Sequence, residues 1–182
     1  NKMKNELKEL RHRYFNARTR NEKLRLQRKD KKLRKEISKL LINNYVWDSQ
    51  VAQQLITFNP YDQNISVSFF DLEWMFGITD GFDIVIGNPP YVKESTHKNA
   101  FDGLRMSPYY QGKMDLWYYF GCIGLDVLKK NGFMCYIATN NWISNDGASK
   151  FRDKILKEGR LLKYVDFGNY KIFAAGIQTM IL

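Results

Sequence analysis

The segment from Phe82 to Tyr91 constrains the fold of this chain more than any other. It begins as an apolar run rich in β-branched residues, which predicts a fully buried strand of a parallel sheet. It ends in Asn88-Pro89-Pro90-Tyr91, where each proline lacks a backbone N–H and fixes φ near about −65°, so the strand stops there. Asn88 precedes a proline and is therefore extended. The sequence thus places an amide and an aromatic ring at the carboxyl end of a strand, where open α/β sheets bind ligands.

This turn suits chemistry on a conjugated amino group. If the side-chain carbonyl of Asn88 and the backbone carbonyl of Pro89 each accept one N–H, the nitrogen becomes more tetrahedral and more nucleophilic. Pro90 stiffens the turn, and Tyr91 is placed to stack on a nucleobase that has been rotated out of its duplex. These four residues are the catalytic candidates. The alternative is an ordinary turn at the end of a strand.

The strand and the Asn-Pro-Pro-Tyr turn together resemble the catalytic motif of the gamma-class, TaqI-like adenine-N6 DNA methyltransferases and of related type II (type IIG) restriction–modification enzymes. The resemblance covers roughly residues 66–182. It implies S-adenosyl-L-methionine as cofactor, a flipped-out adenine in double-stranded DNA as acceptor, and the activity class EC 2.1.1.72. Because the turn suits any planar conjugated nitrogen, RNA or a protein glutamine amide stays open as acceptor. A non-catalytic nucleic-acid-binding module is a third interpretation.

The remaining pattern predicts an α/β fold, the C-terminal half of a Rossmann-like methyltransferase sheet with doubly wound topology. We expect helices at about 115–130 and 147–157 and strands at 133–138, 161–167 and 177–182. The first of these helices is expected to turn five residues inward: Leu116, Phe120, Ile123, Leu125 and Leu128. Residues 66–71 are either a short strand or the approach to one.

The resemblance also implies roles for residues outside the catalytic turn. Asp115 would lie near the cofactor or the catalytic turn, together with Asn88, although a helix N-cap is the alternative for Asp115. Phe173 would stack on the base opposite Tyr91, unless it is a core aromatic. Asp71 is the candidate for contacting the adenine of the cofactor; otherwise it is a turn or cap residue. In the polar loop 92–113 we expect four cations either to reach DNA phosphates or to be solvated: Lys93, Lys98, Arg105 and Lys113.

The positive charge of the chain belongs to one arm. Residues 1–39 carry 16 Lys or Arg and 5 Asp or Glu, whereas the remainder has a net charge of −1. The arm lacks Gly and Pro, and its apolar spacing predicts two helices that meet at Thr19 to Glu22, a capping-box pattern, with stripes at Leu7, Leu10, Tyr14 and Ala17 and at Leu33, Ile37, Leu40 and Leu41. The basic face is either a solvated surface or a nucleic-acid contact.

We therefore expect a basic helical arm at residues 1–43, inserted before a partial methyltransferase domain at 44–182 that lacks the glycine-rich cofactor motif. The chain reads as an inactive piece of a longer restriction–modification polypeptide. Its exposed sheet edge could pair with a second copy. No apolar run approaches 18 residues and no signal peptide is evident, so we expect a cytoplasmic protein without membrane contact. Cys122 and Cys135 are expected to be reduced, buried thiols, and no metal site is expected.

Overall fold

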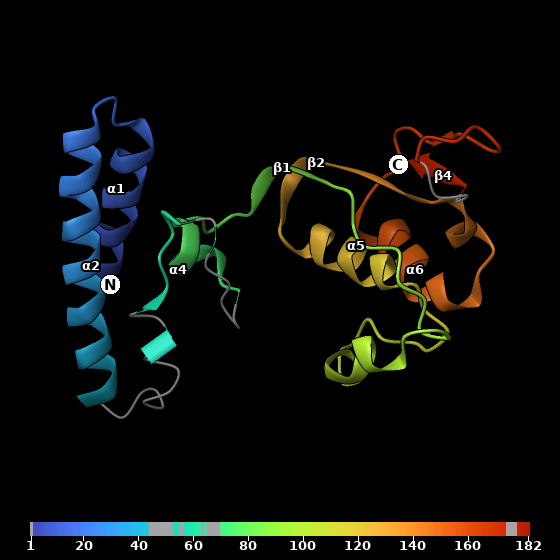
Figure 1. Cartoon of the computed structure of the whole chain (residues 1–182), viewed down its shortest axis with the longest axis horizontal. Helices are drawn as coiled ribbons and strands as arrows, with labels where there is room; N and C mark the ends of the chain where they lie inside the picture. The colour runs from blue at the N-terminus through green and yellow to red at the C-terminus, as the bar shows by residue number, and fades with distance from the viewer. Residues whose placement is uncertain (1, 44–52, 55–56, 63, 65–69, 174–177) are drawn as a thin grey trace. The chain divides into compact units, whose positions relative to one another are not determined.

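The computed structural model describes residues 2–43, 53–54, 57–62, 64, 70–173 and 178–182. It comprises two compact units, Asn1–Thr79 and Asp80–Leu182, whose helices and strands are labelled in Figure 1. The boundary at Thr79 separates two parts that each pack mainly against themselves. It does not test the boundary predicted after residue 43, between an inserted arm and a methyltransferase domain, which stays a prediction.

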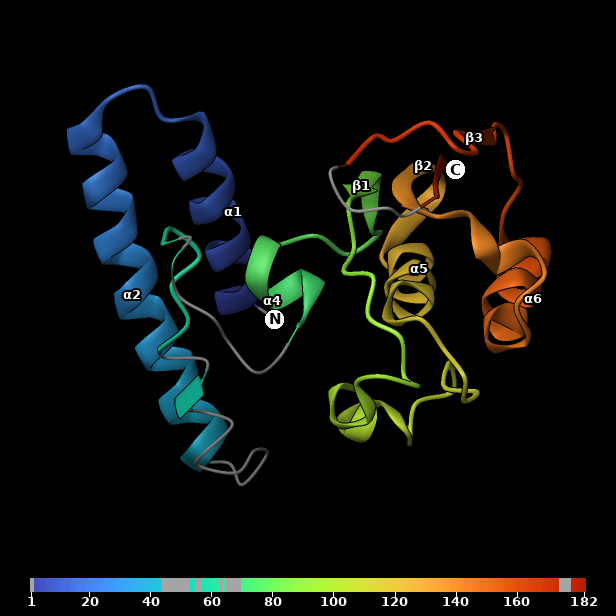
Figure 2. The ribbon, with the colours of Figure 1, turned by 45° about the vertical axis from the view of Figure 1, so that its right-hand side comes forward.

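Two helices that lie side by side form the first unit, α1 (Lys2–Asn16) and α2 (Arg20–Asn43), and the short α4 (Leu72–Phe76) packs on α1 (Figures 1 and 2). The predicted break is confirmed: the N–H of Glu22 donates to the hydroxyl of Thr19 at 3.3 Å, as a helix cap does. Of the predicted stripes, Leu7, Leu10, Leu33 and Ile37 are buried, Tyr14 and Ala17 are partly buried, and Leu40 is exposed. The buried apolar residues of this unit are Leu7, Leu10, Leu26, Leu33, Ile37, Phe58 and Met75.

An ionic cluster lies inside this helical pair. The carboxylate of Asp30 is fully buried and accepts from Nε of Arg11 at 3.1 Å and from Nε of Arg34 at 2.5 Å. Arg34 also donates to the backbone carbonyl of Phe58. A buried charge needs such partners, because its desolvation would otherwise cost several kcal/mol. The cluster thus fixes α1 against α2 and withdraws the Asp30 charge from the surface.

A four-stranded sheet carries the second unit, in the order β1-β2-β4-β3. β1 runs parallel to β2, and β4 lies antiparallel to both β2 and β3. The helix α5 connects β1 to β2 and α6 connects β2 to β3, so the predicted α/β class is confirmed. In Figures 1 and 2, α5 covers one face of the β1–β2 pair. The bounds are β1 (Phe82–Gly87), α5 (Leu116–Asp126), β2 (Leu128–Thr139), α6 (Ser149–Glu158), β3 (Val165–Asp166) and β4 (Thr179–Ile181).

The prediction that β1 is fully buried is wrong. The strand pairs with β2 along one edge and is the first strand in the order of the sheet, so its other edge has no partner strand among the described residues. Ile84 is 64% exposed and Ile86 is 74% exposed. Their β2 partners on the same face, Phe133 and Cys135, are exposed as well. The apolar run therefore predicts the strand correctly, but no described segment covers the face that carries Ile84 and Ile86.

The inner face predicted for α5 is only partly right. Leu116 and Leu125 pack against the core, but Phe120 is 42% exposed, and the fully buried residues are Trp117, Tyr118 and Cys122. Gly121 explains the rotation, because a Cβ there would lie 2.4 Å from the ring of Phe151, so only glycine lets that ring approach. The core of this unit forms around these contacts: Phe101, Met114, Trp117, Tyr118, Cys122, Ala138, Trp142, Ala148, Phe151, Ile155 and Met180.

Two element boundaries differ from the prediction. α5 ends at Asp126 and β2 begins at Leu128, because the residues expected to extend the helix form the irregular start of the strand, where Lys129 pairs with Asp83 at 3.0 Å. The strand expected at 161–167 is limited to two residues, because β3 pairs only with the three-residue β4. The helix expected at 147–157 is confirmed as α6, preceded by the short η3 (Asp146–Ala148).

The second unit contains two more short 3₁₀ segments, η1 (Lys98–Leu104) in the loop after the Asn-Pro-Pro-Tyr turn and η2 (Asn140–Ile143) directly after β2. The possible strand at 66–71 lies largely outside the described residues. None of the helices in the described part of the chain is both long enough and apolar enough to cross a membrane.

Candidate active site

The Asn88-Pro89-Pro90-Tyr91 turn lies directly after β1, as predicted. Asn88 is exposed, Pro89 is buried, and Pro90 is exposed. The hydroxyl of Tyr91 lies 2.6 Å from Oδ1 of Asn88 and 2.9 Å from the backbone oxygen of Ile137 in β2. Because a hydroxyl has one proton, it donates to one of these acceptors at a time. The first contact orients the side-chain amide of Asn88 with its oxygen toward Tyr91. The second connects the turn to the neighbouring strand β2.

A cavity of about 530 Å³ opens beside this turn. Tyr91 forms one side, and the ends of β2 and the segments flanking β3 and β4 form the others. It is therefore a cavity at the carboxyl ends of parallel strands, where the topology of an α/β sheet concentrates ligand sites. Its lining residues are Tyr91, Lys93, Asp115, Thr139, Asn140, Asn141, Gly168, Asn169, Lys171 and Gln178.

A chain of hydrogen bonds fixes the polar groups where β2 ends. The indole N–H of Trp117 donates to the hydroxyl of Thr139 at 2.8 Å, which donates to Oδ1 of Asn141 at 2.9 Å. The hydroxyl of Tyr118 contacts the same amide oxygen at 3.1 Å and accepts from Nδ2 of Asn145. The oxygen of Asn141 is occupied on two sides, and its NH₂ group has no hydrogen bond among the described residues, so this lining residue can offer a donor to the cavity.

Asp115 lies in the wall of this cavity, at the residue that precedes α5. Only 1% of it is exposed, and neither carboxylate oxygen makes a hydrogen bond of normal geometry. Burial raises the pKa of Asp115, and the opposing effects of the N–H groups at the start of α5 and of the Lys93 charge do not cancel this rise. Its side chain does not cap α5, so the N-cap alternative lacks its defining hydrogen bond. A buried acceptor of this kind suits a ligand that brings a donor or a positive charge.

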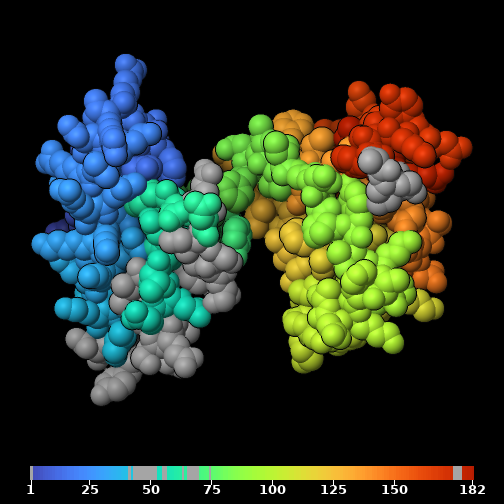
Figure 3. Space-filling model, viewed as in Figure 1, coloured from blue at the N-terminus to red at the C-terminus, as the bar shows by residue number. Residues whose placement is uncertain are grey.

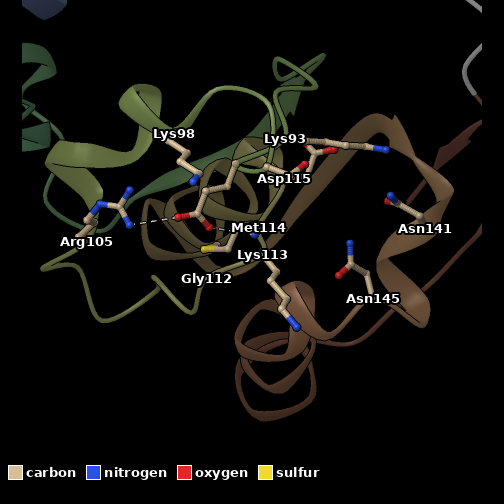
Figure 4. Close-up of a pocket in the computed structure, with 11 residues that line it drawn as sticks. Lys93, Lys98, Arg105, Gly112, Lys113, Met114, Asp115, Asn141 and Asn145 are labelled. Carbon is tan, nitrogen blue, oxygen red and sulfur yellow. Dashed lines mark hydrogen bonds and ion pairs between the residues drawn. The ribbon is translucent and has the colours of Figure 1, made fainter.

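A second cavity, of about 540 Å³, shares Lys93, Asp115 and Asn141 with the first. Figure 4 shows it between the loop that follows Tyr91 and the segment that follows β2. All four loop cations predicted to contact DNA line it. The structure therefore brings together residues that the sequence could only assign to one loop: Lys93, Lys98, Arg105 and Lys113.

Glu94 organises this loop, a role that the sequence analysis missed. Its carboxylate accepts from the hydroxyl of Tyr110, from Nη1 of Arg105 at 3.2 Å, and from the N–H of Met114 at 3.4 Å. Burial alone would raise the pKa of Glu94, but these hydrogen bonds and the Arg105 charge hold it below its ordinary value. No periodicity marks a loop carboxylate of this kind, and only its contacts with distant residues reveal it.

The described contacts do not test the roles predicted for two site residues, Phe173 and Asp71. Phe173 is half-buried and does not line either cavity, although Lys171 two residues before it does. Asp71 lies in the first unit, directly before α4, where its backbone carbonyl accepts from the N–H of Met75. The roles predicted for both residues stay predictions.

The two cysteines differ in environment. Cys122 is buried in the core, and burial raises the pKa of its thiol to about 12, so it is an inert packing residue. Cys135 is exposed on β2, which corrects the expectation that both thiols are buried. Among the described residues, no group of three or more His, Cys, Asp or Glu is arranged to hold a metal ion.

Comparisons with known proteins identify the family of this chain. The model of the Eco57I restriction-modification methylase family matches residues 2–173, a range that also contains the helical arm. The chain is 30% identical over 99 residues to the type II restriction enzyme and methyltransferase RM.Eco57I of Escherichia coli, a match that covers 50% of this chain and 10% of that protein. It is 28% identical over 106 residues to the type II methyltransferase M.XhoI of Xanthomonas vasicola, covering 54% and 18%.

The matched regions thus span only a small part of the length of these curated relatives. Within this chain the family match is nearly complete, and it includes β1, the Asn-Pro-Pro-Tyr turn, the loop held by Glu94 and the lining residues of both cavities except Gln178. The chain therefore belongs to the Eco57I restriction-modification methylase family.

Proposed function

We propose that the protein to which this chain belongs is a site-specific adenine-N6 DNA methyltransferase of the gamma, TaqI-like class (EC 2.1.1.72), acting within a type II (type IIG) restriction–modification enzyme. This proposal rests on one observation: Asn88 directly follows the parallel strand β1, and its amide oxygen is oriented by the hydroxyl of Tyr91. The family and its type II relatives support the same conclusion.

The turn provides the two acceptors that an adenine amino group needs. A carbonyl oxygen has two lone pairs, so Oδ1 of Asn88 can hold one N–H of the base while it accepts from Tyr91. The backbone carbonyl of Pro89 would accept the other N–H. Both contacts strengthen as positive charge develops on the nitrogen, which is how preorganised dipoles accelerate a reaction. No general base is required beforehand, because the proton becomes acidic only after the nitrogen has gained its extra bond.

The flipped base would lie in the cavity beside Tyr91. The ring of Tyr91 would stack on one face of the base and that of Phe173 on the other, each contact contributing roughly 1–3 kcal/mol. Rotation out of the duplex is needed because the amino group of a stacked, paired adenine is inaccessible. The NH₂ group of Asn141 in the cavity wall supports binding of a partner with acceptor atoms, which a nucleobase has.

S-adenosyl-L-methionine is the proposed cofactor and would supply an electrophilic methyl group. The buried carboxylate of Asp115 fits a group with a positive charge and N–H donors, because its own oxygens lack hydrogen bonds of normal geometry. Asn88 would help to position the same group beside the base. Asp71 is proposed to contact the adenine of the cofactor, on the basis of the sequence resemblance alone.

The loop cations are proposed to bind the phosphates that flank the flipped base. Lys93, Lys98 and Lys113 line the second cavity together with Arg105. The guanidinium of Arg105 also pairs with Glu94 and Asp102, so we assign it a dual role in shaping the loop and binding a phosphate. Cations that contact phosphates give affinity without sequence specificity.

Methyl transfer from labelled S-adenosyl-L-methionine to duplex DNA tests this proposal, with the full-length protein and its Asn88→Ala variant compared directly. We expect label on adenine N6 with the intact protein and none with the variant, while both still bind DNA. The 182 residues alone are expected to be inactive and to self-associate. Label on RNA or on a glutamine amide instead would refute the DNA assignment, and Asn88→Ala with unchanged function would refute catalysis by this turn.

A further inference from the structure

The solvent face of α2 carries charge of almost one sign. At 3.6 residues per turn, its exposed cations fall on one side of the helix, opposite the buried Leu26, Leu33 and Ile37. Glu36 is the acid on this face. Figure 3 shows atoms of α2, in the lighter blue, at the surface of the first unit. The cations are Arg25, Arg28, Lys29, Lys31, Lys32, Lys35 and Lys39, and we call them the α2 basic face.

The neighbouring helix shows what an ordinary solvated face looks like in this protein. On α1 the exposed Glu6 and Glu9 alternate with Lys2 and Arg13, and Lys4 is paired with Glu73 at 3.1 Å. Mixed signs of this kind support an exposed helix through pairs three or four residues apart. On the α2 basic face Glu36 can pair with Lys32 or Lys39. Most neighbours four residues apart on this face nevertheless carry like charges, such as Arg28 with Lys32 and Lys31 with Lys35, and such pairs destabilise a helix. Solubility alone would not require such an arrangement.

The interior of the helical pair increases this asymmetry. Asp30 lies in the middle of α2, but its carboxylate is buried between Arg11 and Arg34 and contributes no charge to the surface. The apolar side of α2 is likewise occupied by packing against α1. A helix that inserts into a membrane surface needs a free apolar side, so a polyanion in water fits the α2 basic face better than a lipid bilayer does.

We propose that the α2 basic face binds the phosphate backbone of duplex DNA without reading its sequence. The choice of DNA as the polyanion rests on the proposed function. From Arg25 to Lys39 the helix rises by about 21 Å. A DNA strand has one phosphate per about 3.4 Å of helix axis, so this length spans roughly six phosphates. The face would hold the duplex outside the catalytic cavity and raise affinity for every sequence equally.

The test uses the whole chain and two variants of equal charge change. The first replaces Arg28, Lys32 and Lys35 by Gln, and the control replaces the exposed Lys157, Arg160 and Lys163 of the second unit by Gln. Binding to a 20-base-pair duplex would be measured by fluorescence anisotropy from 50 to 200 mM salt, with circular dichroism to verify that the helices persist. Each lost phosphate contact removes about 0.9 from the slope of log affinity against log salt.

We expect the α2 variant to lower the magnitude of that slope by about 2–3 and to lower the affinity at 0.1 M salt by roughly 100-fold or more. The control variant should leave both the slope and the affinity nearly unchanged. Equal losses in both variants, absence of duplex binding by the intact chain, or tighter binding to duplex RNA or to phosphatidylserine vesicles would each overturn the proposal. If the α2 basic face binds DNA but the full-length protein does not methylate adenine, only the proposed function is refuted. If the full-length protein methylates adenine but the α2 variant binds DNA as well as the intact chain does, only this inference is refuted.

Discussion

Tyr91 combines two physical roles in one side chain. The residue lines the cavity beside the catalytic turn, where its ring is proposed to stack on the base, while its hydroxyl contacts the oxygen of Asn88 and the backbone oxygen of Ile137 in β2. Burial, together with the nearby Asp115 charge, raises the pKa of Tyr91, so the hydroxyl keeps its proton and remains a donor at neutral pH. The two roles can be separated by substitution, because phenylalanine retains the ring and removes only the hydroxyl.

We predict that Tyr91→Phe in the full-length protein lowers kcat for DNA methylation by about 5–30-fold, the effect of losing one orienting hydrogen bond. The KM for DNA should change little, because the stacking ring remains. Tyr91→Ala should also raise KM, since the stacking contact is lost. Tyr109→Phe, which removes a hydroxyl bound to Asp126 outside this cavity, is the control. Identical kinetics for Tyr91→Phe and Tyr91→Ala would contradict the separation of roles.

The ionised carboxylate of Asp115 destabilises the folded protein, and a role in binding would explain why it is there. Because burial raises its pKa in the folded protein, folding favours the protonated carboxyl. Its contribution to stability is therefore complete below the unfolded pKa of about 3.9 and is lost as the pH rises through the folded pKa. We predict that Asp115→Asn raises the Tm at pH 7, has no such effect below about pH 4, and abolishes methyl transfer by the full-length protein. Thermal unfolding monitored by circular dichroism across this range checks the first part, and a lower Tm at pH 7 would be inconsistent with it.

The contact between α5 and α6 depends on a missing side chain. Gly121 on α5 lies against the ring of Phe151 on α6, with no room for a methyl group. We predict that Gly121→Ala destabilises the second unit by about 1–3 kcal/mol through overpacking, despite the better helix propensity of alanine. Gly103→Ala is the matched control, because a Cβ at Gly103 has no neighbour within 4 Å. Urea unfolding of the three proteins would measure the difference, and equal midpoints would show that the ring moves aside freely.

Some features of these elements could be predicted from the sequence, whereas others depend on contacts between distant residues. The break at Thr19, the turn after β1 and the α/β alternation follow from local rules for caps, prolines and apolar runs, and the structure confirms them. The inner face of α5 does not follow from such rules, because it depends on where Phe151 packs. Similarly, the gathering of the loop cations in one cavity depends on Glu94, whose partners lie 11 to 20 residues away. The predicted contact of Asp71 with the cofactor and the predicted stacking of Phe173 on the base depend on arrangements that the described residues do not establish.

The chain as a whole presents two unlike surfaces. The first unit offers the α2 basic face, a charged surface suited to a polyanion. The second offers an apolar sheet face, formed by Ile84 and Ile86 with Phe133, next to the strand edge of β1 that lacks a partner among the described residues. An unpaired edge with exposed apolar side chains is a template for strand pairing. The two surfaces therefore predict different associations of the same chain.

Pairing of β1 with β1 of a second copy would satisfy both the edge and the apolar face. In an antiparallel pair centred on Val85, Ile84 of one copy lies opposite Ile86 of the other on the exposed face, and Asp83 meets Gly87 rather than another charge. We therefore predict that the 21.6 kDa chain sediments as a dimer at micromolar concentration. Ile86→Lys should shift it to a monomer, because a charge would then lie among apolar partners, whereas Leu156→Lys at an equally exposed position of α6 should not. Sedimentation velocity distinguishes these states, and a monomeric unmodified chain would show that the exposed face of β1 does not suffice for self-association.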